Sequence, residues 1–111
     1  MTELSLEVIQ VSGSARLTLR GELDIASYPA ANRTLLELLE RGFDEVIVDL
    51  TGLDFMDSMG VKFLIDGRET ARQLGVEIAL AYEEGVVERV LTVSGVATLF
   101  ERQDDKRGSP G

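Results

Sequence analysis

The run Val46-Ile47-Val48-Asp49-Leu50 constrains the fold more than any other segment of this chain. It is short, rich in β-branched residues and almost wholly apolar, which is typical of a strand buried on both faces inside a sheet. Small or apolar residues recur at three- and four-residue spacing before it, in 31–39, and after it, in 60–74. A buried strand between two amphipathic helices predicts an α/β domain with helices packed on a central sheet.

The residues before this unit predict a β-hairpin. Apolar and polar side chains alternate over 4–8 and again over 15–19, which is the period of a strand with one buried face. Residues 12–14, Ser-Gly-Ser, form a turn between the two strands. The alternation changes phase over 9–11, which indicates a β-bulge there.

Two helices flank the buried strand. The first is expected to begin near Pro29, with Ser27 or Tyr28 at its cap, and to be closed by Gly42. The second is expected over 58–73, where glycines on the buried face let the helix approach the sheet closely. The predicted buried faces consist of Ala31, Leu35, Leu38 and Leu39 in the first helix and Gly60, Leu64, Gly67, Ala71 and Leu74 in the second.

The remaining segments predict a strand over 76–81 and a third helix over 86–93 that ends at Gly95. Residues 99–100 are either a short edge strand or a last packing contact. The resulting order, ββαβαβα, predicts an α/β fold with a mixed four- to five-stranded sheet and packed helices. We expect one domain over residues 1–102 and a disordered tail over 103–111. The third helix has three valines on one side, Val86, Val90 and Val93.

Charge and missing residue types exclude several classes of function. The 111-residue chain has no Cys and no His, which excludes disulfides, thiolate metal sites and Ser-His triads. Its net charge is −9, and its 11 basic residues are scattered among 20 acidic ones, whereas nucleic-acid binding requires clustered positive charge. Neither a membrane span nor a signal peptide is indicated. We expect a cytoplasmic, non-enzymatic protein without catalytic residues, metal or cofactor, which binds a basic partner.

The start of the second helix leaves two interpretations of Ser58 open. In the first, Ser58 or Asp57 only caps the helix. In the second, the free N–H groups and the positive end of the helix dipole accommodate a phosphate on the Ser58 hydroxyl. Met59 and Phe63 follow, off the predicted buried face. They either form an exposed apolar ridge beside Ser58 or pack under a neighbouring loop.

Four motifs occur in order along the chain. They are Gly21-Glu22-Leu23-Asp24, then Val46-Ile47-Val48-Asp49-Leu50, then Phe55-Met56-Asp57-Ser58-Met59-Gly60, and last Val93-Ser94-Gly95-Val96 with Leu99-Phe100. Each motif alone is weakly specific. Together, at family-like spacing over residues 4–101, they strongly resemble the STAS domain of bacterial anti-sigma factor antagonists.

The resemblance implies a phosphorylation cycle. The unphosphorylated antagonist binds an anti-sigma factor that is also a serine kinase, with a histidine-kinase-like ATPase fold, and a sigma factor is released. The kinase phosphorylates the serine that follows Asp in the motif, here Ser58, and a phosphatase of the metal-dependent PP2C type resets it. The candidate partner-binding residues are Asp24, Asp57 and Ser58 from the resemblance, and Met59 and Phe63 from the apolar ridge considered above. Asp24 lies in a loop that the family places near the site, although an Asp there is also a common turn residue.

One position departs from the family pattern. The family often has Asp-Ser-Ser-Gly, and Met59 replaces the second serine here. The substitution makes the expected partner surface more apolar, which implies either a different kinase partner or different regulation. The free protein is either a monomer or a weak dimer.

Three other functions are alternatives. A response-regulator receiver would be phosphorylated at Asp49, but the chain lacks an acidic pair after its first strand and a suitably placed lysine after a late strand. A hydrolase with Ser58 as nucleophile would need a His and a Gly-x-Ser-x-Gly elbow, and neither is present. A STAS subunit of a stress-signalling scaffold or of a lipid-transport complex would keep the motif without binding an anti-sigma kinase.

Overall fold

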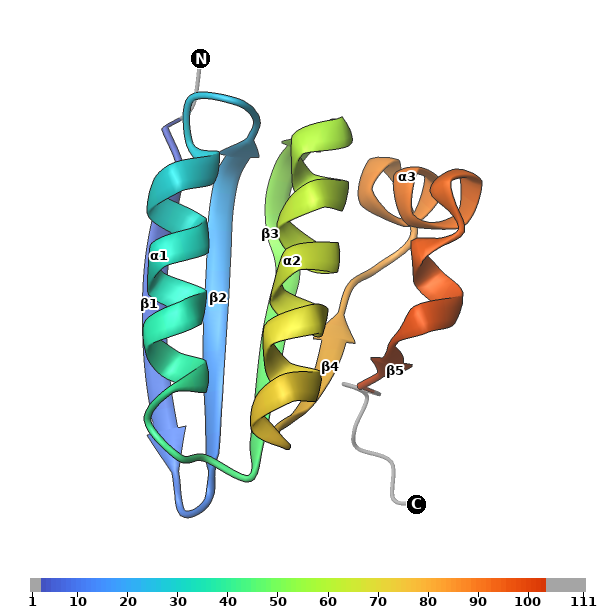
Figure 1. Cartoon of the computed structure of the whole chain (residues 1–111). Coiled ribbons are helices and arrows are strands. Elements are labelled where there is room, and N and C mark those ends of the chain that lie inside the picture. The colour runs from blue at the N-terminus through green and yellow to red at the C-terminus, as the bar shows by residue number, and fades with distance from the viewer. Residues whose placement is uncertain (1–2, 104–111) are drawn as a thin grey trace.

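The computed structural model describes residues 3–103 and shows an α/β fold built on one mixed sheet (Figure 1). The predicted order ββαβαβα is confirmed, and a short 3-10 helix and a fifth strand follow it within the described residues. The elements are β1 (Ser5–Val11), β2 (Ser14–Leu23), α1 (Tyr28–Leu39), β3 (Glu45–Met56), α2 (Ser58–Leu74), β4 (Glu77–Ala81), α3 (Val86–Ser94), η1 (Val96–Leu99) and β5 (Glu101–Arg102).

The spatial order of the strands equals their order in the chain, β1-β2-β3-β4-β5. β1 pairs antiparallel with β2, and each later strand pairs parallel with its predecessor. Parallel neighbours need a crossover, which α1, α2 and α3 with η1 provide. In Figure 1, α1 and α2 cover one face of the sheet, and α3 stands beyond α2 on the side of β4 and β5.

β3 is the central buried strand that the sequence predicts, but it is longer than expected. Residues 46–50 are all buried. The strand continues to Met56, well beyond the apolar run that marks it in the sequence. Residues 52 and 53 pair with residues 20 and 21 of β2, and the register shifts at two points where β3 has an extra residue relative to β2. Pairing with a neighbouring strand therefore outweighs the local tendency of Thr-Gly to end a strand.

β1 contains no bulge, contrary to the sequence prediction. Its pairing with β2 runs without interruption from Ser5↔Arg20 to Val11↔Ser14. Ile9 and Val11 are exposed on this edge strand. The change of phase in the sequence therefore reflects apolar side chains that point to solvent rather than a change in the backbone.

α1 has the predicted buried face and the predicted start. Ser27 is its N-cap, and Pro29 lies in its first turn. The helix ends at Leu39 with Glu40 as C-cap, so Gly42 does not close it. Gly42 has φ 91° and lies instead in the turn that leads to β3. The buried residues of α1 are Ala31, Leu35, Leu38 and Leu39, as predicted.

α2 packs closely on the rest of the core through its glycines. A Cβ on Gly67 would lie 2.5 Å from Cδ2 of Leu35, so this glycine lets α1 approach α2. Four of the five predicted buried residues of α2 are buried. The exception is Leu74, which is exposed in the last turn before the left-handed C-cap Gly75.

The C-terminal part of the fold differs in detail from the prediction. α3 buries Val87 and Leu91, whereas Val93 is 82% exposed. Leu99 belongs to η1, and the edge strand follows it as β5. Gln103 is described and donates its N–H to the Leu80 carbonyl oxygen over 2.7 Å, while the rest of the predicted tail lies outside the described residues. Among residues 3–103, no helix is long and apolar enough to cross a membrane.

Gly21 in β2 is expected to tolerate substitution poorly. Its φ is 107°, and an added Cβ would collide with the carbonyl oxygen of Glu3. Gly21→Ala should lower the free energy of unfolding by about 2–4 kcal/mol, because backbone strain and overpacking add. Gly42→Ala is the matched control, since Gly42 also has positive φ but open space around it, and it should cost only about 1–2 kcal/mol. Urea denaturation measures both values, and equal losses would contradict the role of the Glu3 contact.

Candidate functional site

The carboxyl ends of β2 and β3 bring two acidic residues to the same edge of the sheet. Leu23 at the end of β2 pairs with Met56 at the end of β3. The N–H of Asp57 donates to the carbonyl oxygen of Leu23 over 3.4 Å. Asp24 follows β2 and Asp57 follows β3, so both leave the sheet at this edge. The carboxyl edge of parallel strands is where α/β folds place their binding sites.

Asp57, and not Ser58, is the N-cap of α2. Its backbone is extended, with φ −117° and ψ −159°, and its carboxylate accepts from the N–H of Met59 over 2.9 Å. Its carbonyl oxygen accepts from the N–H of Gly60 over 2.9 Å. The capping role that the sequence left open between Asp57 and Ser58 therefore belongs to Asp57.

Ser58 is the first residue of α2 and is exposed. Within residues 3–103, its hydroxyl makes no hydrogen bond to the protein. The positive end of the helix dipole lies next to it and favours negative charge. A phosphate on this hydroxyl would therefore break no bond on which the helix depends.

Phe63 is a core residue, so its predicted position off the buried face is wrong, and of the two interpretations left open the exposed ridge with Met59 is excluded. The side chain of Phe63 is 0% exposed, whereas Met59 is half-buried. Phe63 follows Gly60 by three residues and precedes Gly67 by four. A helix with 3.6 residues per turn therefore places it on the same buried face as the two glycines. This spacing is the sequence signal that would have identified it.

A groove of about 380 Å³ lies between the start of α2 and α3, and Ser58 lines it. The sequence places Val90 and Val93 on one side of the third helix, but it does not indicate that they lie across a groove from Ser58. No local pattern relates two helices that are separated by a strand. The residues that line the groove are Asp57, Ser58 and Val61 from the start of α2 and Arg89, Val90, Val93 and Ser94 from α3.

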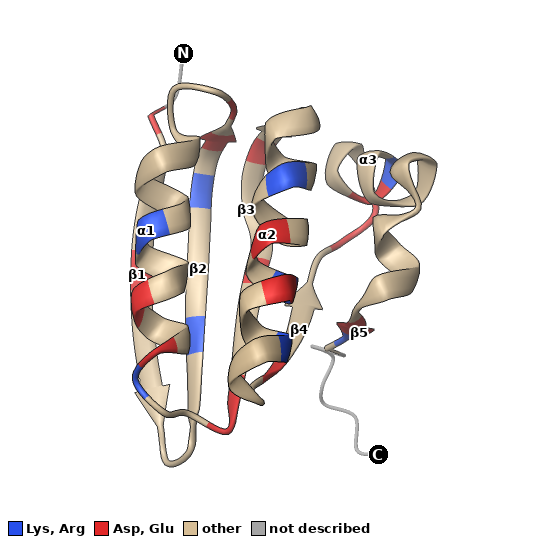
Figure 2. Cartoon of the chain, viewed as in Figure 1, with Lys and Arg blue, Asp and Glu red and all other residues tan. Residues whose placement is uncertain are grey.

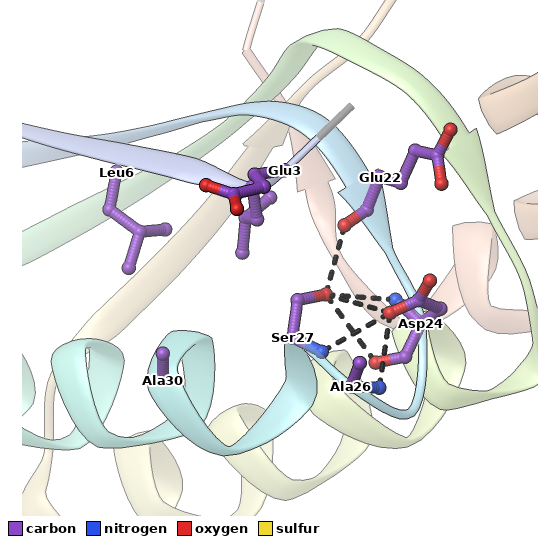
Figure 3. Close-up of a pocket in the computed structure, with 8 residues that line it drawn as sticks. Glu3, Leu6, Glu22, Asp24, Ala26, Ser27 and Ala30 are labelled. Carbon is purple, nitrogen blue, oxygen red and sulfur yellow. Dashed lines mark hydrogen bonds between the residues drawn. The ribbon is translucent and has the colours of Figure 1, made fainter. Parts of the chain in front are cut away.

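Asp24 lies in a separate pocket of about 300 Å³ between β1, the end of β2 and the start of α1 (Figure 3). Its Oδ1 accepts from the N–H groups of Ala26 and Ser27, each over 3.1 Å. The hydroxyl of Ser27 donates to the carbonyl oxygen of Glu22 over 2.9 Å. These bonds confirm the turn role of Asp24. The partner-binding role of Asp24 stays a prediction. Asp24 lies at the same edge of the sheet as Ser58, but the two residues line different pockets.

A polar cluster ties α1 to α2 one turn beyond Ser58. The hydroxyl of Tyr28 and the ammonium of Lys62 both donate to Oδ2 of Asp66, over 2.6 and 3.0 Å. The hydrogen bond with Tyr28 lowers the pKa of Asp66, and the same bond raises the pKa of Tyr28. The hydrogen bond with Asp66 likewise raises the pKa of Lys62. The Lys62 ammonium is therefore engaged by Asp66 and Tyr28.

Asp49 does not have the environment of a receiver's phosphorylated aspartate. It lies inside β3 and accepts from Nε of Arg16 over 3.0 Å and from the N–H of Thr51 over 2.9 Å. Burial alone would raise the pKa of Asp49, but hydrogen bonds from Thr51 and Arg16 outweigh burial and hold that pKa below its ordinary value. The strand order also differs from the 2-1-3-4-5 order of the flavodoxin-like fold to which receivers belong.

Charged residues are spread over the elements rather than gathered by sign. In the view of Figure 2, Lys and Arg lie singly on α1, β2, α2 and α3, with Asp and Glu between them. Two of the arginines form exposed ion pairs, Arg20 with Glu7 and Arg72 with Glu69. In the part of the chain that the structure describes, no group of three or more acidic side chains has an arrangement that could hold a metal ion. An acidic protein with this distribution suits a basic protein partner better than nucleic acid.

The family model of the STAS domain matches residues 5–107. The chain belongs to the STAS domain family. The match confirms the family that the four sequence motifs indicated. A comparison of this STAS domain with curated protein sequences gives no significant match.

Solved structures share the fold of this STAS domain at low sequence identity. An anti-sigma factor antagonist from Mycobacterium paratuberculosis has a TM-score of 0.82 at 18% identity, with 88% of this chain and 83% of that chain covered. The anti-sigma factor antagonist SpoIIAA in its unphosphorylated form has a TM-score of 0.76 at 20% identity, with 96% and 100% covered. SpoIIAA from Bacillus in the phosphorylated form has a TM-score of 0.67 at 20% identity, with 91% of each chain covered. At these identities, the likeness establishes the fold.

Two alanine variants separate the cap of α2 from its exposed hydroxyl. Asp57→Ala is expected to lower the free energy of unfolding of this STAS domain by about 1 kcal/mol, because the N–H of Met59 loses its acceptor. Ser58→Ala should change that free energy by less than about 0.5 kcal/mol, because the exposed hydroxyl bonds nothing. Chemical denaturation provides the comparison. A larger loss for Ser58→Ala than for Asp57→Ala would mean that Ser58 caps the helix.

A second pair of variants tests the corrected position of Phe63. Phe63→Ala should lower the free energy of unfolding by about 3–5 kcal/mol, because it leaves a cavity in the core. Met59→Ala, at a half-buried position one turn earlier, should cost about 1 kcal/mol. Thermal and urea unfolding measure both. A loss below about 1 kcal/mol for Phe63→Ala would contradict its burial.

Proposed function

We propose that this STAS domain is an anti-sigma factor antagonist that is switched by phosphorylation of Ser58. The unphosphorylated form binds an anti-sigma factor that is also a serine kinase, and a sigma factor is thereby released. The kinase transfers the γ-phosphoryl group of ATP to the Ser58 oxygen, the hydroxyl proton is lost and ADP leaves. A PP2C-type phosphatase then hydrolyses the phosphoserine. Membership of the STAS family and a fold in common with solved anti-sigma factor antagonists support this function.

The observation that carries the proposal is the division of roles at the start of α2. Asp57 satisfies the helix N-terminus through its bond to the N–H of Met59. Ser58 is left exposed with a hydroxyl that makes no bond in the described residues. A kinase can therefore reach this hydroxyl without unfolding the first turn. A capping serine would have had to give up a structural hydrogen bond first.

Electrostatics gives the direction of the switch. A phosphate on Ser58 adds about −1.5 to −2 charge to a helix N-terminus, which tolerates it, so the fold should persist. The chain already has a net charge of −9, and Asp57 lies next to the added charge. A partner surface suited to the uncharged Ser58 hydroxyl must then desolvate a phosphate at the centre of the contact, and this cost releases the partner even where its surface is basic overall.

The partner surface is centred on the carboxyl edge of the sheet. We place Asp57, Ser58 and Met59 in it, with Asp24 at the end of the neighbouring strand. Met59 is half-buried and presents an apolar surface where the family often has a serine. Phe63 is excluded because its side chain is fully buried.

Phosphorylation with candidate kinases and ATP, followed by mapping of the phosphosite, tests the acceptor. Ser58→Ala should abolish incorporation, and phosphate that persists in this variant would assign the acceptor to another residue. The phosphate should survive acid, as phosphoserine does, whereas an acyl phosphate at Asp49 would be lost. The stability of Ser58→Ala serves as the folding control.

Binding to the cognate kinase tests the switch itself. Ser58→Asp should weaken binding at least about tenfold relative to the wild type, because a permanent charge then lies at the centre of the interface. Ser58→Asn, of similar size and without charge, is the matched control and should bind more tightly than Ser58→Asp. Equal affinity of Ser58→Asp and the wild type, measured by titration calorimetry, would refute the electrostatic switch. A pull-down that recovers a scaffold or a lipid-transport complex instead of a kinase would favour that alternative within the family.

A further inference from the structure

The groove beside Ser58 has a basic residue on its opposite side. Ser58 belongs to α2 and Arg89 to α3, and both line the same groove of about 380 Å³. Val61, Val90 and Val93 form the apolar part of its wall. The groove is open to solvent and its lining is almost wholly apolar, so the charged ends of Asp57 and Arg89 lie at its rim.

Arg89 has no ion pair with any residue in 3–103, and its side chain is exposed. Other arginines of the fold are engaged, for example Arg72 by Glu69 and Arg102 by the carbonyl oxygen of Tyr82. A guanidinium offers several N–H donors in a planar array, which matches the oxygens of a phosphate. Arg89 is therefore a cation at the rim of the groove that is available to a new anion beside Ser58.

The other charged groups near Ser58 do not offer the same contact. Asp57 also lines the groove, but it is acidic and would repel a phosphate. Lys62 lies one turn after Ser58 on α2, but its ammonium donates to Asp66 over 3.0 Å and does not line the groove. Glu88 lines an adjoining pocket together with Arg89. Its carboxylate carries less charge than a phosphate dianion, so it is the weaker competitor for the Arg89 guanidinium.

We propose that Arg89 binds the phosphate on Ser58 and thereby closes the groove between α2 and α3. This inference rests on the proposed phosphorylation of Ser58. The phosphate would link two helices that pack only lightly on each other, since α3 packs chiefly on β3. Closure covers the valines of the groove, of which Val93 is 82% exposed in the unphosphorylated protein. Phosphorylation then removes an apolar docking surface from the partner in addition to placing a charge that the contact must desolvate.

Phosphoserine placed at position 58 during synthesis of the full chain tests the contact without any kinase. An Arg89 ion pair favours the dianion, so the second pKa of the phosphate, followed by ³¹P NMR, should lie below the value of about 6 for a free phosphoserine. Arg89→Gln should raise that pKa by about half a unit or more. Lys62→Gln removes the same charge one turn away and is the matched control, with a smaller shift expected. A shift in Arg89→Gln no larger than in Lys62→Gln would overturn the proposal.

Amide hydrogen exchange provides a second readout. Phosphorylation should slow exchange in α3 of the wild type, and Arg89→Gln should abolish that slowing. Unchanged exchange in α3 on phosphorylation would contradict closure of the groove. Because the phosphoserine is built in, these outcomes do not depend on a kinase. If phosphoserine at position 58 closes the groove but no kinase phosphorylates Ser58, the proposed function is refuted while the contact between Arg89 and the phosphate is upheld.

Discussion

The parallel pairing of β2 and β3 is the constraint on which the site depends. Their register brings Leu23 opposite Met56, and the N–H of Asp57 then bonds to the carbonyl oxygen of Leu23. This pairing determines where the chain leaves the sheet and therefore where α2 begins. The same pairing extends β3 beyond Gly52, which brings the first turn of α2 to the carboxyl edge. Gly60 completes the arrangement, since any larger side chain would collide with Met56.

At the start of α2, one residue stabilises the helix end and the next residue presents an accessible hydroxyl. Asp57 supplies the hydrogen bond that the helix end needs, and Ser58 keeps a free hydroxyl one residue later. A helix N-terminus favours negative charge, so adding a phosphate there does not oppose folding. A modification at such a position changes what the protein presents to a partner and leaves its core unchanged. This is the physical basis of the proposed phosphorylation switch.

The third helix gives the site a second side. α3 is anchored by Val87 and Leu91, while its valines at 90 and 93 and Arg89 face the groove at Ser58. A cation across an apolar groove from a modifiable hydroxyl provides an internal receptor for the added charge. In the proposed switch, release of the partner has two components, the cost of desolvating the phosphate and the loss of apolar surface. The acidic pocket at Asp24 lies outside this arrangement and is organised by the turn before α1.

The sequence by itself determined the order of elements, the burial of residues 46–50, the predicted buried face of α1 and the placement of Ser58 at a helix start. These features follow from local periodicity and from residues with strong conformational preferences. The family could also be recognised, because its motifs are short and contiguous. The tertiary structure alone decided that β3 continues to Met56, that β1 has no bulge and that Arg89 lies across a groove from Ser58. Each of these depends on pairing or packing between segments distant in the chain, which no local pattern encodes. The burial of Phe63 depends on both. Its helical spacing from Gly60 and Gly67 is present in the sequence, but only the packed core shows that it lies on the buried face.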